Sequence, residues 1–424
     1  METIKTYSFP RAGLLGNPSD GYFGKTVSFA FSDFGVELTL TESARLCFVP
    51  GEVDDATFAS PDDLVRDLRL YGYYGGIRLL KAVSKRFFEY CIKHDIALPK
   101  RNFTASYKIN IPRLVGLSGS SAICTAMLKA LCRFYEVPIL VGAPSCSCRK
   151  EENLHSPTPT PNSNSSIGIP MEVLPTICLE AEKEELRINC GFQDRVIQIY
   201  NGLVFMDFNK SFVEAHNHGI YERLDPSILV GAPSCICSED LNLHSPTPTL
   251  NSNLIHLYIA YDAQRAEESG EAHKEVKRLF EAKNSDVLAA MSEFADIAQR
   301  GRDLLVGVSS CSCRKDINLH SPTPTSNSNS KLAELVNANF DLRDRIFNVA
   351  EENRRMVMTA RSVGASAKFA GSGGAIVGTY EDDAQFAALV HALGAIGCKT
   401  FRPTIATSDE TPEIRSAAAN WRNS

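Results

Sequence analysis

Residues 112–122 read PRLVGLSGSSA, and they lead directly into ICTAMLKALCRFY at residues 123–135. The second stretch has apolar residues at helical spacing, which predicts a helix behind a Gly/Ser loop. Such a loop presents backbone N–H groups and the positive end of the helix dipole to an anion, most often phosphate. The segment lacks the Gly-Lys-Ser/Thr of a Walker loop and the Gly-x-Gly-x-x-Gly dinucleotide pattern. By itself it is equally compatible with a plain helix N-terminus.

The elements around this segment alternate between strand and helix. Short strands are predicted at residues 6–10 and 26–31, on either side of a Gly/Pro/Ser/Asp loop over residues 13–24. The other expected elements are helices over about 76–91, 267–300, 331–361 and 382–393, strands around 103–111 and 375–378, and a Gly-rich turn at 371–374. This mixture predicts an α+β fold.

The composition is that of a globular protein with room for two domains. Of the 424 residues, 44% are apolar and 22% are charged, and 44 Lys+Arg against 50 Asp+Glu give a formal charge of −6. Long basic runs are missing, so neither nucleic acid nor an anionic membrane surface is an expected partner. The N-terminus has no apolar leader, and no run of 18 apolar residues occurs. We expect a cytoplasmic protein.

One 25-residue segment occurs three times in nearly identical form, at residues 140–164, 229–253 and 305–329. The copies start 89 and 76 residues apart, which excludes the fixed period of a solenoid. Their second halves are Ser/Pro/Thr/Asn tracts. We therefore expect three extended, disordered surface excursions, inserted at element boundaries where insertion is tolerated best.

The copies contain six of the thirteen cysteines, and the odd total argues against a simple disulfide framework. Each copy has Cys-x-Cys followed by a histidine (His155, His244 or His320), and thiolate and imidazole are zinc ligands. One copy offers only three ligands at an unusual spacing, so plain inserts are the favoured interpretation. Another hypothesis is that each copy is a short intron read through in frame. Peptides spanning the copies would then be missing from the native protein, and the encoded chain would be an inactive product.

Residues 181–196 place several carboxylates before a turn at Gly191 and then deliver Asp194. Magnesium-dependent phosphoryl transfer needs a carboxylate and a hydroxyl on the metal, and a group that orients the attacking hydroxyl. Glu182, Ser121 and Asp194 have the right chemistry for these three tasks. Glu182 also lies in a Glu/Lys run that is typical of a solvated helix face.

Three loops in this order resemble the ordered motifs of the GHMP small-molecule kinases: PRAGLLGNPSD at 10–20, PRLVGLSGSSA at 112–122 and KFAGSGGA at 368–375. Further segments, among them NFDLR at 339–343, are similar to the plant-type glucuronokinases of that family. The resemblance covers about residues 7–406, interrupted only by the copies. It implies a domain like ribosomal protein S5 domain 2 over residues 1–209 and a ferredoxin-like domain over 210–424, with ATP in the cleft between them.

The activity implied by the resemblance is ATP-dependent phosphorylation of the anomeric hydroxyl of D-glucuronate. The product, glucuronate 1-phosphate, would enter nucleotide-sugar salvage toward UDP-glucuronate. The expected partners are then a small sugar acid and ATP with Mg²⁺, in a monomer or homodimer. Asn17-Pro18 stands where other sugar kinases of the family carry Glu-His, which argues against galactokinase. Arabinose, fucose, galactose and a heptose remain alternative substrates, because a few pocket contacts decide specificity.

The resemblance also implies roles for individual residues. Asp194 would be the catalytic carboxylate, and Arg11 would stabilise the transferring phosphoryl group. The residues that would wrap the phosphates are Gly116, Leu117, Ser118, Gly119, Ser120, Ser121 and Ala122. The magnesium ligands would be Ser121 and Glu182. The substrate would contact Asn17, Asp20, Gly371, Ser372, Gly373 and Gly374.

Which arginine would hold the substrate carboxylate stays open among Arg113, Arg195 and Arg361, although a guanidinium fork is the directional way to bind such a group. Residues 73–76, Tyr-Tyr-Gly-Gly, are either a wall of the sugar site or part of the core.

Overall fold

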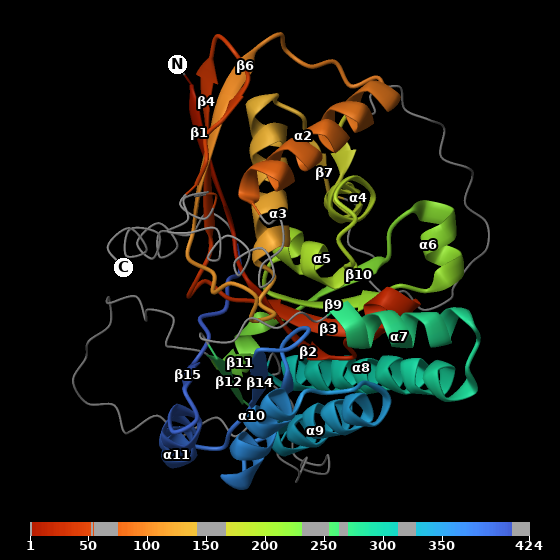
Figure 1. Ribbon diagram of the computed structural model, residues 1–424, viewed down its shortest axis with the longest axis vertical. Coiled ribbons are helices and arrows are strands. Elements are labelled where there is room, and N and C mark those ends of the chain that lie inside the picture. The colour runs from red at the N-terminus through yellow and green to blue at the C-terminus, as the bar shows by residue number, and fades with distance from the viewer. Residues whose placement is uncertain are drawn as a thin grey trace, which may run out of the picture.

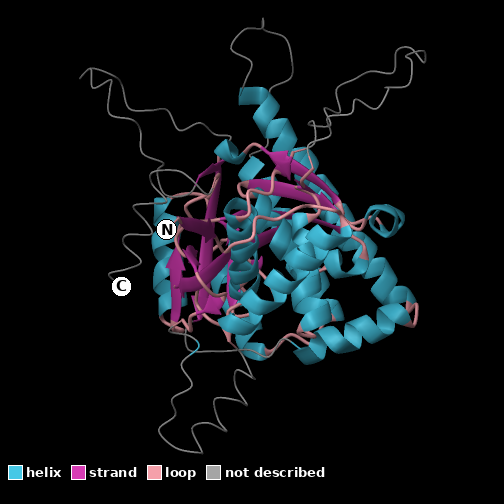
Figure 2. Ribbon diagram, turned by 90° about the horizontal axis from the view of Figure 1, so that it is seen from above, coloured by secondary structure: helices cyan, strands magenta, loops and turns pink. Residues whose placement is uncertain are grey.

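The computed structural model describes residues 2–51, 54, 75–141, 167–230, 254–262, 270–312 and 328–408. These residues form a mixed α+β structure, as predicted, with sheets inside and helices around them (Figure 2). Most of each 25-residue copy lies outside the described residues, as do Tyr73 and Tyr74, so the candidate zinc ligands other than Cys311, which lies in α8, have no structural account. No helix in the described ranges is long and apolar enough to cross a membrane.

The first sheet has the strand order β1-β4-β6-β5 and carries helices on one face (Figure 1). Its strands are β1 (Thr3–Ser8), β4 (Val36–Ser43), β5 (Cys47–Phe48) and β6 (Asn102–Ile109). The helices are α2 (Gly76–Lys93), α3 (Gly119–Phe134), α4 (Leu174–Glu180) and α5 (Gln193–Tyr200), and a π-helical turn η3 (Ala181–Glu185) follows α4. Because α3 packs between the sheet and the other helices, it is buried on nearly every side. That location explains its almost uniformly apolar sequence.

The second sheet has the order β10-β9-β3-β2 and is antiparallel throughout. Its strands are β2 (Arg11–Leu15), β3 (Lys25–Ala30), β9 (Leu203–Asp207) and β10 (Ile220–Leu224). The predicted loop over residues 13–24 is wrong at its start, because β2 is buried on both faces and continues through a bulge to Leu15. The turn η1 (Ser19–Tyr22) follows, and α6 (Lys210–His216) joins β9 to β10. The domain boundary after residue 209 stays a prediction, and β10 lies beyond it while pairing with β9.

The third sheet has the order β11-β12-β14-β13, and β15 pairs with the end of β12 on the edge opposite β14, the edge that β11 also occupies. Its strands are β11 (Leu229–Val230), β12 (Ile255–Asp262), β13 (Lys368–Phe369), β14 (Ala375–Thr379) and β15 (Cys398–Phe401). The later helices are α7 (Gly270–Glu281), α8 (Ser285–Ser312), α9 (Ser328–Ile346), α10 (Glu351–Ser362) and α11 (Asp383–Gly394). Helix α8 packs on β3 of the second sheet, and α9 contacts both β2 and β14. The second and third sheets therefore share a helical layer.

Helix boundaries differ from the predictions for local reasons. The expected helix over 267–300 is two helices, because the Asn284 side chain caps α8 by accepting from the backbone N–H groups of Asp286 and Val287. The segment 331–361 likewise divides into α9 and α10. The third copy was expected to be extended, but its first eight residues, 305–312, continue α8. Leu305 is buried there, so core packing supports the helix.

The described elements on either side of each copy contact each other. The short strand β7 (Ile139–Leu140) pairs in parallel with β8 (Ile169–Pro170), across the first copy. Leu229 pairs with Ile255 across the second copy, after the turn η4 (Pro226–Ile228), and α8 packs against α9 across the third.

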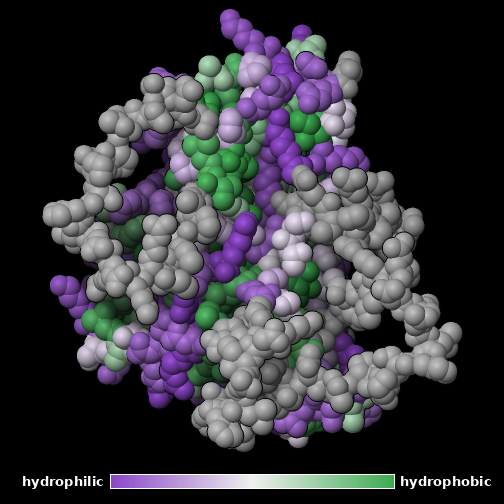
Figure 3. Space-filling model, turned by 180° about the vertical axis from the view of Figure 1, so that it is seen from behind, coloured by the Kyte–Doolittle hydropathy of each residue, from purple (hydrophilic) through white to green (hydrophobic). Residues whose placement is uncertain are grey.

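On the face of the molecule seen from behind, apolar side chains lie in separate patches among hydrophilic ones (Figure 3).

Because the strands that flank the first two copies pair with each other and α8 packs against α9, short Gly-Ser linkers replacing residues 142–166, 231–253 and 313–327 should preserve the fold. Loop-closure entropy changes slowly with length, so each replacement should alter the free energy of unfolding by no more than about 2 kcal/mol. Urea denaturation followed by circular dichroism measures this, with single replacements as controls. Loss of the cooperative transition would show that the replaced segments are part of the fold.

Candidate functional site

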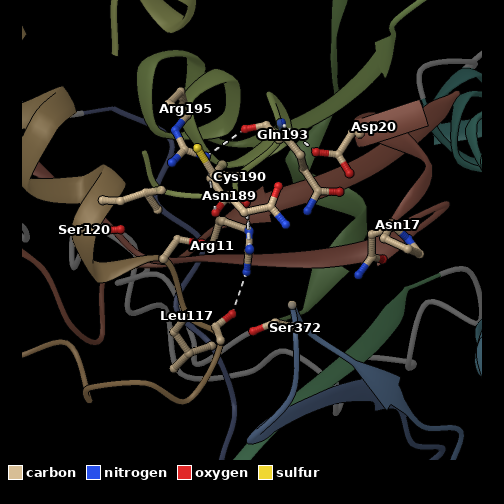
Figure 4. Close-up of a pocket in the computed structure, with 18 of the residues that line it drawn as sticks. Arg11, Asn17, Asp20, Leu117, Ser120, Asn189, Cys190, Gln193, Arg195 and Ser372 are labelled. Carbon is tan, nitrogen blue, oxygen red and sulfur yellow. Dashed lines mark hydrogen bonds and ion pairs between the residues drawn. The ribbon is translucent and has the colours of Figure 1, made fainter. Parts of the chain in front are cut away.

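A cavity of about 660 Å³ lies where the three motif loops meet. Of the residues singled out in the sequence, its wall contains Arg11, Asn17, Asp20, Gly116, Leu117, Ser118, Gly119, Ser120, Asp194, Gly371 and Ser372. The remaining ones, Ser121, Ala122, Glu182, Gly373 and Gly374, lie outside this wall. Figure 4 shows Leu117 and Ser120 at one end of the cavity and Asn17 and Asp20 at the other, with Arg11 between them.

Arg11 connects all three motifs. Its Nε lies 2.6 Å from Oδ1 of Asp194, and its Nη2 completes the ion pair at the same distance. Its Nη1 donates to the carbonyls of Gly116 (2.7 Å) and Ala370 (3.2 Å). The guanidinium is buried, so the carboxylate and the two carbonyls replace the water that it loses.

The two carboxylates of the cavity have opposite electrostatic environments. Burial disfavours ionisation of Asp194, but the charges of Arg11 and Arg195 outweigh it, so the pKa of Asp194 lies below its usual value. Burial raises the pKa of Asp20 to about 6, and the negative charge of Asp194 adds to this shift. The backbone N–H of Gln193, 3.2 Å from Oδ2, partly offsets it. The carboxyl group of Asp194 is therefore ionised at neutral pH, whereas that of Asp20 titrates at about pH 6.

The Gly/Ser loop forms the start of α3 as well as the approach to it. The helix begins at Gly119, four residues earlier than the apolar spacing indicates. Ser118 precedes it with φ 65°, and Gly116 has φ 74°, so both turn the chain through the left-handed region. A Cβ on Gly116 would lie 2.5 Å from the carbonyl oxygen of Gly373. The Gly/Ser loop and the last motif loop, residues 368–375, therefore touch through their backbones, which permits only glycine at this point.

The two expected magnesium ligands lie beneath this loop. Ser121 is buried and its hydroxyl donates to the carbonyl of Ser118 at 3.1 Å. Glu182, fully buried, uses Oε2 to accept from Nε and Nη2 of Arg195, while its Oε1 has no hydrogen-bond partner in the described structure. Burial raises the pKa of Cys124, a residue one turn after Ser121 on α3, and the charge of Glu182 adds to this shift. The expected solvated face at Glu182 is therefore a buried ion pair.

Asn17 is held by residues from the other end of the chain. Its Oδ1 accepts from Nζ of Lys368 at 2.6 Å, and its backbone carbonyl accepts from Nδ2 of Asn339 at 3.1 Å. Oδ1 of Asn339 accepts from the N–H of Gly16 at 2.6 Å. The loop after β2 is thus fixed by β13 and α9.

The alternatives for carboxylate binding separate in the structure. Arg113 and Arg195 line the cavity, whereas Arg361 lies outside its wall and pairs with Asp341 at 2.6 Å. Gly75 and Gly76 stand at the N-terminus of α2, away from the cavity wall, and the N–H of Gly76 donates to Asp54.

Several wall residues were not singled out from the sequence: Tyr22, Cys190, Gln193, Lys277, Phe280 and Arg343. Gln193 adjoins Asp194, and Arg343 ends the NFDLR segment, so both had a sequence signal. Tyr22 packs edge-on against Phe280 of α7, a contact that only the folded structure brings about.

Comparisons with known proteins agree with the three motifs. The family described as GHMP kinases N terminal domain matches residues 78–142. Glucuronokinase 1 of Arabidopsis thaliana is 37% identical over 378 residues, covering 88% of this chain and 84% of that protein. Probable glucuronokinase 2 of the same plant is 38% identical over 375 residues, covering 87% and 82%.

A solved structure has the same fold at low sequence identity. Galactokinase of Lactococcus lactis, complexed with galactose, superposes with a TM-score of 0.61 at 12% identity, covering 96% of this chain and 95% of that one. This similarity supports the architecture and carries no conclusion about substrate.

The opposite environments of Asp20 and Asp194 predict opposite stability effects of Asp20→Asn and Asp194→Asn. The raised pKa of Asp20 means that the folded chain binds the extra proton, so its ionisation lowers stability as pH rises from about 3.8 to about 6. Asp20→Asn should therefore be more stable than wild type at pH 7.5, by up to about 3 kcal/mol, with the gain vanishing below pH 4.

Asp194 should behave in the other direction. Its lowered pKa contributes stability above the ordinary Asp range, and that contribution is lost as pH falls through the folded pKa. Asp194→Asn should be less stable at pH 7.5, with the deficit shrinking in acid. Urea titrations of both variants over pH 3.5–8 measure this, and changes of the same sign would contradict the assigned environments.

Proposed function

The chain belongs to the GHMP kinases, in their glucuronokinase branch, and from this we propose that it transfers the γ-phosphoryl group of ATP to the anomeric hydroxyl of D-glucuronate. The single observation that carries the proposal is the position of the Arg11–Asp194 pair. It lies between a phosphate-type loop at the start of α3 and a polar pocket at Asn17 and Asp20. ATP and the sugar would then both lie beside the Arg11–Asp194 ion pair.

The phosphates of ATP are proposed to bind at Gly116 to Ser120, where backbone N–H groups and the N-terminus of α3 face the cavity. Phosphoryl transfer passes through a loose transition state, so catalysis relies mainly on positioning and charge stabilisation. Arg11 contacts the carbonyl of Gly116 and therefore stands beside the bound phosphates. Its positive charge would stabilise the group in transfer.

Asp194 is proposed to orient the anomeric hydroxyl and accept its proton. Its lowered pKa keeps the carboxylate ionised at neutral pH, so it is ready to accept a hydrogen bond from the attacking hydroxyl. Asp20 and Asn17 at the far end would contact the sugar. The loop at Gly371 and Ser372 lies beside Arg11, because Arg11 donates to the carbonyl of the neighbouring Ala370. This loop would therefore lie near both the phosphates and the sugar.

Ser121 and Glu182 are the proposed magnesium ligands. Their donors fit a hard cation: an alcohol oxygen and a buried carboxylate oxygen, Oε1, that lacks a hydrogen-bond partner in the described structure. When bound, the ion would neutralise charge on the phosphates of ATP. Arg195, which pairs with Oε2 of Glu182, would hold this carboxylate in place.

The remaining expectations concern partners and location. A sugar acid and ATP are the proposed partners, while the oligomeric state, monomer or homodimer, stays a prediction from sequence. The cytoplasmic location and the role in UDP-glucuronate supply likewise stay predictions.

The proposal predicts selective turnover of glucuronate. In a coupled assay of ADP release, kcat/KM for glucuronate should exceed that for galacturonate, galactose, arabinose and fucose by about 100-fold or more. Asp194→Ala should lower kcat at least about a thousandfold, since the carboxylate acts in the transition state. Asp303→Ala, which removes an exposed carboxylate on α8, is the control. Equal turnover of all five sugars, or full activity of Asp194→Ala, would contradict the proposal.

The metal assignment predicts a separate effect of Glu182→Gln. This variant should bind Mn²⁺, used in place of Mg²⁺, at least about tenfold more weakly in the presence of ATP, as measured by electron paramagnetic resonance. Glu184→Gln, in the same acidic run but exposed, should bind Mn²⁺ normally. Equal Mn²⁺ affinity in the two variants would exclude Glu182 as a ligand.

A further inference from the structure

A buried lysine, Lys368, lies directly under the sugar end of the cavity. Its Nζ is 2.5 Å from the carbonyl of Gly13, 2.6 Å from Oδ1 of Asn17 and 2.8 Å from the carbonyl of Phe369. Only 1% of its surface is exposed. Three oxygen acceptors engage all three N–H donors of an ammonium group, whereas a neutral amine has two. The geometry therefore calls for the charged form of Lys368.

The charge of Lys368 is compensated differently from that of the neighbouring arginines. Arg11 pairs with Asp194, and Arg195 pairs with Glu182. Within the described part of the chain Lys368 has only neutral acceptors, and burial together with the charges of Arg343 and Arg11 lowers its pKa well below the usual value. A buried cation of this kind gains most from a nearby anion.

The wider surroundings of the sugar end also favour an anion. Arg343 and Lys277 line the cavity there, together with the carboxylates Asp20 and Glu281. Tyr22 lies among these groups, since the charges of Asp20, Arg343 and Glu281 all affect its pKa. With Lys368 beneath the wall, three cations stand against two carboxylates. The carboxylate of a substrate would supply a third negative charge and balance the three cations.

The hydrogen bond from Lys368 decides which group Asn17 presents at the cavity surface. Because its Oδ1 is engaged by Lys368, the amide presents its N–H donors to the remaining surroundings. One N–H reaches the carbonyl of Phe369 at 3.5 Å, and the described residues offer the other no acceptor. Asn17 lies in the cavity wall, so this donor is available to a ligand oxygen.

We propose that Lys368 selects a sugar acid by fixing Asn17 as a hydrogen-bond donor and by placing a buried positive charge beneath the substrate carboxylate. The inference rests on the proposed function and names how that site distinguishes a uronate from a neutral sugar. Lys368 is a positioning residue, because Asn17 stands between it and the substrate. A neutral group in place of the substrate carboxylate leaves Lys368 without a nearby anion. The site therefore discriminates against a neutral sugar.

The test compares glucuronate with glucuronamide, in which a neutral amide replaces the carboxylate. Lys368→Met should lower kcat/KM for glucuronate about 100-fold and change that for glucuronamide by less than about threefold. The KM for ATP should stay unchanged. Lys399→Met, at an exposed position on β15, is the matched control. Equal losses on both substrates would mark Lys368 as merely structural, and no loss on glucuronate would also overturn the proposal.

A second variant keeps the test decisive where Lys368→Met fails to fold, as circular dichroism would show. Asn17→Asp retains the shape and leaves Lys368 in place, but adds a carboxylate that neutralises it. The preference for glucuronate over glucuronamide should fall about 100-fold, and an unchanged preference would overturn the inference. A wild-type chain that turns over other sugars but no uronate would overturn the proposed function as well. A wild-type preference for glucuronate that survives both substitutions would overturn the inference alone.

Discussion

The contact of Arg11 with Asp194 is the interaction on which the rest of the site depends. It joins the first motif to the carboxylate that starts α5, and the same guanidinium reaches the carbonyls of Gly116 and Ala370. A buried ion pair is stable only when both charges are present and their remaining hydrogen-bonding capacity is met. The two carbonyls meet that need for Arg11. The side chain of Arg11 therefore holds the Gly/Ser loop, the carboxylate of Asp194 and the final glycine turn in place.

The pocket keeps two carboxylates in different protonation regimes. Asp194 is surrounded by guanidinium groups, whereas Asp20 is buried beside another negative charge. Pairs of groups whose pKa values are pushed apart are typical of catalytic sites. The arrangement at Asp20 lowers stability at neutral pH, which is the usual compromise between a binding site and its scaffold.

Much of this structure could be predicted from local sequence, and the remainder depends on long-range contacts. The apolar run at residues 123–135 predicts α3, and the GHMP motifs predict the family and part of the cavity wall. The strand β2 was missed because its burial on both faces removes the alternation that marks a strand. Glu182 resembled a solvated residue because its partner, Arg195, lies thirteen positions away. The role of Lys368 was not predictable, since nothing in its own segment indicates Asn17 as the acceptor.

The hydrogen bond between Lys368 and Asn17 spans 351 positions of the chain. During synthesis on the ribosome Asn17 of the first motif emerges early, but its partner Lys368 emerges only with β13, near the end of the chain. A shortened product ending before β13 lacks Lys368 and cannot form this hydrogen bond. Contacts of such sequence separation are also the slowest to form. Translation must therefore pass residue 368 before this hydrogen bond can form.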